Sequence, residues 1–205
     1  MTIHYPNGQG PQRPAQSRPQ PAVNFADRGM SLEAEINASN AYYLATNQAV
    51  IHKKPTPIQL VKVDYPKRSA AVVREAYFRR PSTTDYNGIY QGYYIDFDAK
   101  ETKNVTSFPL KNFHQHQIDH LAACLKQGGI CFALIKFTRL TAYYLLPASH
   151  LITAWQKQAQ GGKHSIPLAT LKQVGIPVQL GLHPRLQYLS AVDQLIARQK
   201  GVNHE

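Results

Sequence analysis

Residues 83–100 constrain the fold of this chain more than any other stretch, because they have the pattern of a β-hairpin. Two runs rich in Tyr and Ile flank Gln91-Gly92, and a two-residue break of this kind predicts a tight turn between antiparallel strands. Counting outward from that turn gives two facing pairs, Asp85 with Asp98 and Thr83 with Lys100. Since side chains alternate along a strand, we expect all four on one face of the hairpin.

The two facing carboxylates require a partner, because like charges directly opposed on neighbouring strands are destabilising. A divalent cation between Asp85 and Asp98 removes that repulsion, and oxygen ligands of this type suit Mg²⁺, with Mn²⁺ as a substitute. The ammonium of Lys100 would lie beside the cation and hold or polarise what the cation binds. The opposite face of the second strand is apolar, so the strand packs on a core and directs its charges to one place.

An Asp followed about a dozen residues later by Asp-x-Lys on a second strand is the active-site pattern of the PD-(D/E)xK nucleases. In this chain the pattern is Asp85 with Asp98-Ala99-Lys100. The spacing alone leaves open a hairpin that carries ordinary solvated charges. Paired carboxylates also serve glycoside hydrolysis, but that chemistry uses neither a lysine beside them nor a strongly basic surface.

Three histidines, His114, His116 and His120, suggest zinc as a rival to this interpretation. His116 and His120 are four residues apart and would share one face of a helix. No third ligand with suitable spacing and no H-E-x-x-H motif accompanies them, so solvated histidines near a phosphate backbone are the stronger interpretation.

The charge of the chain indicates a polyanionic partner, either nucleic acid or an anionic membrane surface. The net charge is +11, with 23 Lys and Arg against 12 Asp and Glu, and the pI is near 9.7. The basic residues concentrate between His52 and Arg80, directly before the hairpin, which favours DNA. The cations that we assign to DNA contact are Arg28, Lys53, Lys54, Lys67, Arg68, Arg74, Arg79 and Arg80.

Length and composition predict one soluble domain. The chain has 205 residues, enough for one sizeable core. It has neither an apolar run of about 18 residues nor an apolar N-terminal segment, so we expect no membrane span and no signal peptide. Cys124 and Cys131 are in apolar contexts and are expected to be reduced, which indicates a cytoplasmic protein.

The pattern along the chain predicts an α/β fold with a mixed central sheet flanked by helices. Residues 1–26 are rich in Pro and Gln and form a flexible basic arm, 27–200 a single nuclease domain, and 201–205 a flexible tail. The expected helices are 31–46, which begins at Ser31, then 114–127, 151–158 and 186–199. The expected strands are 48–53, 58–63, 130–137 and 142–146, while 67–80 is ambiguous between helix and strand. Gln117 falls on the inward side of its helix and could reach the charged face of the hairpin.

A series of ordered motifs makes the chain similar to a known family. They are Arg28-Gly29-Met30, residues 52–57, 64–68 and 81–88, Ala99-Lys100-Glu101-Thr102, and residues 112–117. Together they closely resemble the RecU family of Holliday junction resolvases, over roughly residues 24 to 195. One departure is that the family usually has Glu where this chain has Asp98.

The resemblance implies a restriction-endonuclease-like core with a protruding stalk at about 56–76 that inserts at the centre of a DNA junction. It also implies that Thr83 and Gln117 complete the metal shell of Asp85 and Asp98, and that Lys100 stabilises the transition state. The implied partners are four-way junction DNA, a second copy in a homodimer, and the RecA recombinase.

The function that we expect is therefore a Mg²⁺-dependent, structure-selective endodeoxyribonuclease that resolves Holliday junctions by paired symmetric nicks in recombination and DNA repair. Two alternatives stay open at this point. One is a non-catalytic protein that binds junction or duplex DNA, and the other is a sequence-specific endonuclease of the restriction type.

Overall fold

The structure is a computed structural model that describes residues 30–64, 72–78 and 83–202. The arm expected over 1–26 lies outside the described residues, and so do five of the cations assigned to DNA contact: Arg28, Lys67, Arg68, Arg79 and Arg80.

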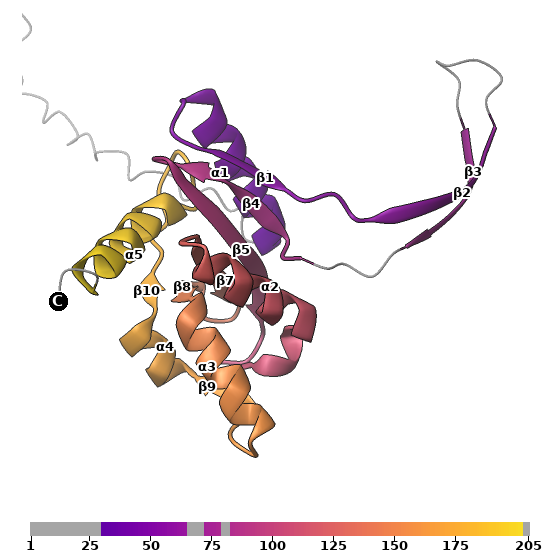
Figure 1. The fold of residues 1–205 in the computed structure, drawn as a ribbon. Coiled ribbons are helices and arrows are strands. Elements are labelled where there is room, and N and C mark those ends of the chain that lie inside the picture. The colour runs from indigo at the N-terminus through magenta and orange to yellow at the C-terminus, as the bar shows by residue number, and fades with distance from the viewer. Residues whose placement is uncertain (1–29, 65–71, 79–82, 203–205) are drawn as a thin grey trace, which may run out of the picture. The chain divides into compact units, whose positions relative to one another are not determined.

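A six-stranded mixed sheet forms the centre of the described fold (Figure 1). Its strand order is β1 (Val50–Lys53), β4 (Tyr86–Tyr90), β5 (Tyr93–Thr102), β7 (Ile130–Phe137), β8 (Ala142–Pro147) and β10 (Ile176–Pro177). Only β5 and β7 pair in parallel, and the other neighbours are antiparallel. The expected mixed central sheet with flanking helices is confirmed, and the strands expected at 130–137 and 142–146 correspond to β7 and β8.

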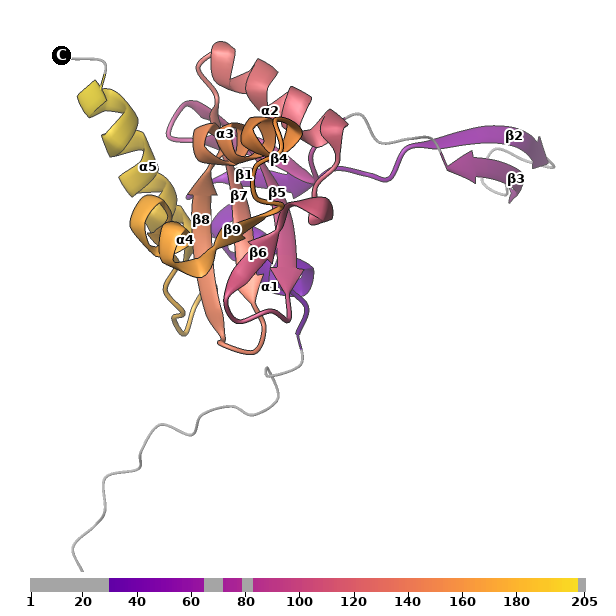
Figure 2. The same ribbon diagram turned by 90° about the horizontal axis from the view of Figure 1, so that it is seen from below.

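Helices cover both faces of this sheet, as the turned view in Figure 2 shows. Helices α1 (Leu32–Ala45) and α5 (Tyr188–Val202) contribute to one hydrophobic core, and α2 (Gln115–Lys126), α3 (Ala148–Ala159) and α4 (Leu168–Val174) to the other. Strand β7 is buried throughout and alternates between them, with Phe132 and Leu134 in the first core and Ala133 and Ile135 in the second. A strand buried on both faces reads as a continuous apolar run, which is why this one was predictable.

Helix α1 begins and ends where the sequence predicts. The Ser31 hydroxyl accepts a hydrogen bond from the backbone N–H of Ala34, which caps the helix, and Thr46 follows its last turn. A second acceptor reaches the same end, because the Glu101 carboxylate on β5 accepts from the backbone N–H of Leu32 at 3.2 Å. The N-terminus of α1 is therefore fastened to the strand that carries the candidate site.

The hairpin of β4 and β5 has the predicted turn and register. Tyr90 pairs with Tyr93, and both loop residues have positive φ, 49° at Gln91 and 81° at Gly92. Two positive φ angles characterise the turn that matches the right-handed twist of paired strands. The ladder ends where Tyr86 pairs with Phe97, so Asp85 lies just before the strand.

Two small sheets complete the described structure. Strands β2 (Ile58–Asp64) and β3 (Val72–Phe78) pair antiparallel with each other, so the described part of the ambiguous segment 67–80 is a strand. Strands β6 (Ser107–Pro109) and β9 (Ser165–Pro167) form the other, followed after β6 by the short 3₁₀ helix η3 (Leu110–Asn112). Within the described ranges, no helix combines the length and apolar character that crossing a bilayer requires.

Candidate active site

Asp98, Asp85 and Lys100 converge at one end of the central hairpin. Asp98 lies on β5 with its side chain fully buried, whereas the Asp85 side chain is 40% exposed. The Lys100 ammonium bridges the two, with Nζ 3.3 Å from Asp85 Oδ2 and 3.2 Å from Asp98 Oδ1. The structure thus brings together the three residues that the hairpin pattern singled out.

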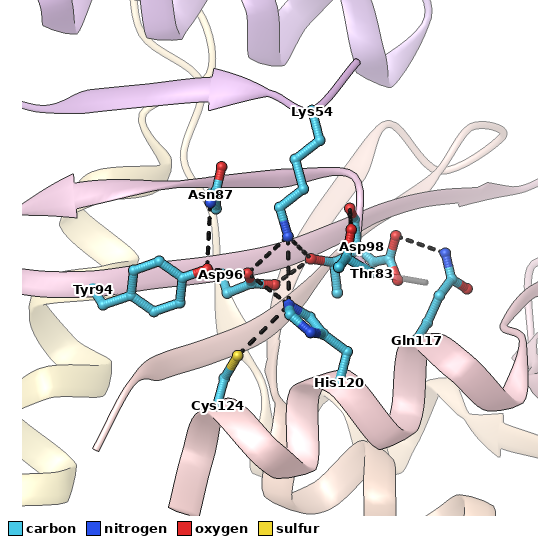
Figure 3. Close-up of polar contacts among 10 residues, drawn as sticks. Lys54, Thr83, Asn87, Tyr94, Asp96, Asp98, Gln117, His120 and Cys124 are labelled. Carbon is cyan, nitrogen blue, oxygen red and sulfur yellow. Dashed lines mark hydrogen bonds and ion pairs between the residues drawn. The ribbon is translucent and has the colours of Figure 1, made fainter. Parts of the chain in front are cut away.

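Gln117 joins this group from the first turn of α2. Its amide Nε2 donates to Asp98 Oδ1 at 3.0 Å, as Figure 3 shows, and its Oε1 accepts from the backbone N–H of His114. The second bond fixes the side chain in the helix cap, so the first is made by a group that is already oriented. The expectation that Gln117 reaches the charged face of the hairpin is confirmed.

Thr83 lines the same cleft as Asp85, but its hydroxyl hydrogen-bonds to the backbone rather than to either carboxylate. Its hydroxyl donates to the backbone carbonyl of Thr84 at 3.3 Å. The cleft that contains Thr83 has a volume of about 500 Å³. A second cleft of about 680 Å³ holds Lys100, Gln117 and their neighbours, and Asp85 lines both. Asp85 therefore stands where two open surfaces meet.

The two carboxylates differ strongly in proton affinity. Burial, together with the adjacent Asp85 carboxylate and its negative charge, raises the pKa of Asp98 to about 8, although Lys100 opposes the shift. Burial also raises the pKa of Asp85, but its interactions with Asp98 and Lys100 outweigh burial and hold that pKa below its usual value. Without a bound cation, Asp98 is therefore the carboxylate of the pair that holds a proton more tightly.

One oxygen of Asp98 lacks a hydrogen-bond donor. Gln117 and Lys100 both donate to Oδ1, whereas Oδ2 is buried and has no hydrogen-bond partner among the described residues. Such an atom costs free energy unless a proton or a cation occupies it. With the Asp85 carboxylate beside it, the nearest acidic groups supply oxygen ligands, as Mg²⁺ and Mn²⁺ prefer. The residues present fit a divalent cation.

A second buried carboxylate, Asp96, lies two residues before Asp98 on the same face of β5. Four side chains hydrogen-bond to it, Thr84, Lys54, Tyr94 and His120, and Figure 3 labels the last three around Asp96. Burial raises the pKa of Asp96, but the hydrogen bonds from these four groups outweigh burial and hold that pKa below its usual value. Hydrogen-bond donors therefore occupy both oxygens of the Asp96 carboxylate.

Asp96, His120 and Cys124 also form the group of potential metal ligands that the described residues bring within 4.8 Å of one another. The zinc alternative from the sequence joined His120 to His116 instead, while the structure stacks His116 on His114 with ring centroids 5.6 Å apart. Cys124, one helical turn after His120, was expected only as a reduced thiol, and both cysteines are free. The Lys54 ammonium already lies 2.9 Å from Asp96 Oδ2 and 3.4 Å from His120 Nε2, where it competes with any cation.

The described cations assigned to DNA contact have different surroundings. Lys53 forms an exposed ion pair with Glu33, and Arg74 on β3 forms one with Asp64 on β2. Exposed pairs of this kind stabilise a protein little and can exchange partners with a phosphate. The Lys54 side chain is only 17% exposed and donates to Asp96 and Thr84 instead.

Comparison with known proteins decides the family. The family described as Recombination protein U matches residues 27–194, more than four fifths of the chain. This chain belongs to the RecU family.

Three relatives named Holliday junction resolvase RecU resemble it over nearly their whole length. The protein of Limosilactobacillus fermentum is 65% identical, with all of both chains covered. That of Limosilactobacillus reuteri is 64% identical, covering 96% of this chain and 98% of the relative. That of Lactiplantibacillus plantarum is 59% identical, covering 96% and 97%. The family expected from the sequence motifs is confirmed.

Among solved structures, Hjc of Archaeoglobus fulgidus, a Holliday junction resolvase from an archaeal hyperthermophile, has a TM-score of 0.41 and 9% identity. The match covers 69% of this chain and 94% of that one.

Proposed function

We propose that this RecU-family chain is an endodeoxyribonuclease that resolves Holliday junctions by paired symmetric nicks. Family membership supports the resolvase activity. The strongest structural support is the buried Asp98 carboxylate beside Asp85 and Lys100, since one of its oxygens has no hydrogen-bond donor among the described residues. A buried acid with a raised pKa, in contact with Lys100 and Gln117 that line an open cleft, is typical of a functional site rather than of a structural ion pair.

In this proposal Asp85 and Asp98 hold Mg²⁺, for which Mn²⁺ can substitute, and Gln117 and Thr83 complete the shell directly or through water. When bound, the cation supplies Lewis acidity and lowers the pKa of a coordinated water. Asp98 must release its proton before it can serve as a ligand, and the neighbouring Lys100 favours that release. Gln117 fixes the orientation of the Asp98 carboxylate through its bond to Oδ1.

Lys100 stabilises the negative charge that develops on the scissile phosphate. Its ammonium is placed between two carboxylates and so is oriented before the substrate arrives. A group of fixed orientation stabilises a transition state more effectively than one that must reorganise. The Lys100 ammonium should therefore affect the rate of cleavage more than the affinity for DNA.

The proposal includes a homodimer. Resolving a four-way junction cleanly requires two symmetric nicks on opposing strands, and a two-fold dimer supplies two sites related by the symmetry of the junction. The stalk at 56–76 would enter the junction centre. Its described strands β2 and β3 support this role, because Leu60, Val61 and Tyr77 are at least half exposed and can pack on unstacked bases. RecA as a second partner, and a cytoplasmic location, also belong to the proposal.

One assay tests the proposed function. Purified protein is incubated with a synthetic four-way junction, or with linear duplex of the same sequence, in Mg²⁺, Mn²⁺ or EDTA, and strand cleavage is mapped. We expect paired nicks at symmetric positions in the junction with either metal, none in EDTA, and little cutting of duplex.

The same assay separates the two alternatives from the proposal. Binding without cleavage in both metals would indicate a non-catalytic junction protein, which the Asp98-for-Glu difference would then explain. Efficient cutting of duplex at a fixed sequence would indicate a restriction-type endonuclease.

A further inference from the structure

We propose that Asp96 is the hub of a buried network that positions the metal-binding pair Asp85 and Asp98, and that Lys54 acts inside this network rather than on DNA. The inference rests on the proposed function, since it concerns the same metal site. It assigns roles to residues that touch neither the cation nor the DNA: Lys54, Thr84, Asp96 and His120.

Asp96 has the contacts of a structural hub. Its side chain is completely buried, and Oδ1 accepts a hydrogen bond from the Thr84 hydroxyl. Oδ2 accepts from Lys54 Nζ at 2.9 Å and from the Tyr94 hydroxyl at 2.7 Å, and His120 Nε2 lies 3.0 Å away. The carboxylate is thus neutralised by one ammonium and hydrogen-bonded at both oxygens, as a stable buried charge requires.

The first element that the hub holds is the segment that carries Asp85. This segment precedes β4, so no ladder pairing of that hairpin fixes Asp85. Lys54 fixes it twice. Its backbone N–H donates to the Asp85 carbonyl at 2.8 Å, and its Nζ donates to the Thr84 hydroxyl at 2.9 Å. Because Thr84 in turn donates to Asp96, the position of Asp85 depends on the network.

The second element is α2, which carries Gln117. His120 follows Gln117 by three residues, so the two side chains share one face of the helix, and Figure 3 shows both directed toward β5. Gln117 contacts Asp98, and His120 contacts Asp96. The helix is therefore held to β5 at two adjacent points, one in the metal site and one in the hub.

The same contacts argue against Asp96, His120 and Cys124 as a metal site of their own. Both oxygens of Asp96 are occupied, and the Lys54 ammonium is in contact with Asp96 and lies near His120. A cation would have to displace that ammonium and leave it partly buried without its partner, at a substantial free-energy cost. We therefore interpret the cluster as an ion pair that organises the neighbouring metal site.

Thr84→Val is the sharpest test, because it removes the hydroxyl and leaves the volume nearly unchanged. Mn²⁺ is titrated calorimetrically into metal-free wild type, Thr84→Val and Thr84→Ser, with thermal unfolding recorded for each. We expect about tenfold weaker Mn²⁺ binding for Thr84→Val and recovery for Thr84→Ser, since lost outer contacts of a metal site typically cost about 10–100-fold.

Thr138→Val is the matched control. Its hydroxyl donates to the Thr102 carbonyl at 3.1 Å, outside the network, so its loss should not change Mn²⁺ affinity. In single-turnover cleavage, raising Mn²⁺ should restore the rate of Thr84→Val. Unchanged Mn²⁺ affinity in Thr84→Val would overturn the inference while leaving the proposed function intact. A wild type that binds no Mn²⁺ would overturn both the proposed metal site and this inference.

The second test compares neighbouring lysines, Lys53→Met with Lys54→Met, in junction binding in EDTA across a series of salt concentrations. A lost phosphate contact lowers the log–log salt slope by about 0.9. We expect that decrease for Lys53, whose ammonium is exposed, and no change for Lys54. Calorimetry should instead show weaker Mn²⁺ binding for Lys54→Met. A reduced salt slope for Lys54→Met with unchanged Mn²⁺ affinity would make Lys54 a DNA contact and overturn its positioning role. Separately, a Zn²⁺ ion bound at His120 and Cys124 in the wild type would overturn the structural role of the hub.

Discussion

Asp96 and Asp98 are two residues apart on one face of one strand, and both are fully buried, yet their surroundings are opposite. Hydrogen bonds occupy both oxygens of Asp96, and its pKa is lowered. Among the described residues no group donates to one oxygen of Asp98, which has a carboxylate neighbour and a pKa raised to about 8. The fold therefore stabilises the negative charge of Asp96, whereas it provides too few hydrogen-bond donors to stabilise a negative charge on Asp98.

The difference shows that burial alone does not determine whether the charge of a carboxylate is compensated. A buried charge with sufficient donors contributes to folding, whereas one with an empty position is destabilising until a ligand arrives. The two lysines that neutralise these carboxylates differ in the same way. Lys54 faces one carboxylate, Asp96, while Lys100 is shared between Asp85 and Asp98.

Asp98→Asn should have the largest effect and should act in opposite directions on activity and stability. Cleavage should be abolished because a ligand is lost, while junction binding persists since the negative charge near the phosphate decreases. In EDTA at pH 8 the variant should unfold at a higher temperature than wild type, because the buried charge is gone. Gel-based cleavage, binding and thermal unfolding measure the three quantities.

The matched variant, Asp96→Asn, should unfold at a lower temperature than wild type, because it leaves the partly buried Lys54 without its counter-charge. If the two substitutions shift the unfolding temperature in the same direction, the contrast between the carboxylates is wrong.

Lys100→Ala should lower the rate of cleavage by about 10²–10³-fold, the usual cost of losing one oriented group that stabilises a transition state. Affinity for the junction should change little, as single-turnover rates and binding titrations can establish. Lys54→Met should instead lower the free energy of unfolding by about 3 kcal/mol. A Lys100 variant that loses affinity and keeps its maximal rate would reassign this lysine to DNA positioning.

The pH dependence of stability provides a third comparison. The pKa of Asp98 is about 8 in the folded protein against a usual 3.8, so between these values the folded chain binds more protons than the unfolded chain. The free energy of unfolding of the metal-free protein should therefore fall as pH rises from about 5 to 8. Thermal unfolding in EDTA across this range should show the decline, and Asp98→Asn should flatten it. A slope equal in both proteins would mean that Asp98 is ionised throughout.

Asp98→Glu should have the smallest effect, because it restores the acid that the family usually carries and keeps the charge. We expect the rate of cleavage to change by less than about tenfold, or about 1.4 kcal/mol in barrier height. A complete loss of cleavage, with wild-type unfolding temperature, would show that Gln117 and Lys100 are arranged around the shorter acid.

The sequence predicted the elements that local chemistry determines. The turn at Gln91-Gly92 fixed the hairpin register, Ser31 marked the start of α1, and the continuous apolar run marked β7. The short strands β6, β9 and β10 were missed, because two or three residues carry no periodicity. Pairing across the fold, rather than a local pattern, defines these strands.

The network around Asp96 was missed for a related reason. Asp96 contacts Lys54, which lies 42 positions away in the sequence, and His120, which lies 24 positions away. No spacing rule connects residues so far apart. Lys54 was taken from the sequence as one of several basic residues before the hairpin, and only its partners identify its role. Asp96 itself was a signal in the sequence. It lies on the same face of a buried strand as Asp98, and a buried carboxylate requires a cation or hydrogen-bond donors.

The most direct test of the account is anomalous diffraction from crystals of the wild-type protein soaked in Mn²⁺. A strong peak bonded to Asp98 Oδ2 and the Asp85 carboxylate, with Lys54 still in contact with Asp96, is the result that we predict. A peak among Asp96, His120 and Cys124, with the position beside Asp98 empty, would contradict the division between the two carboxylates.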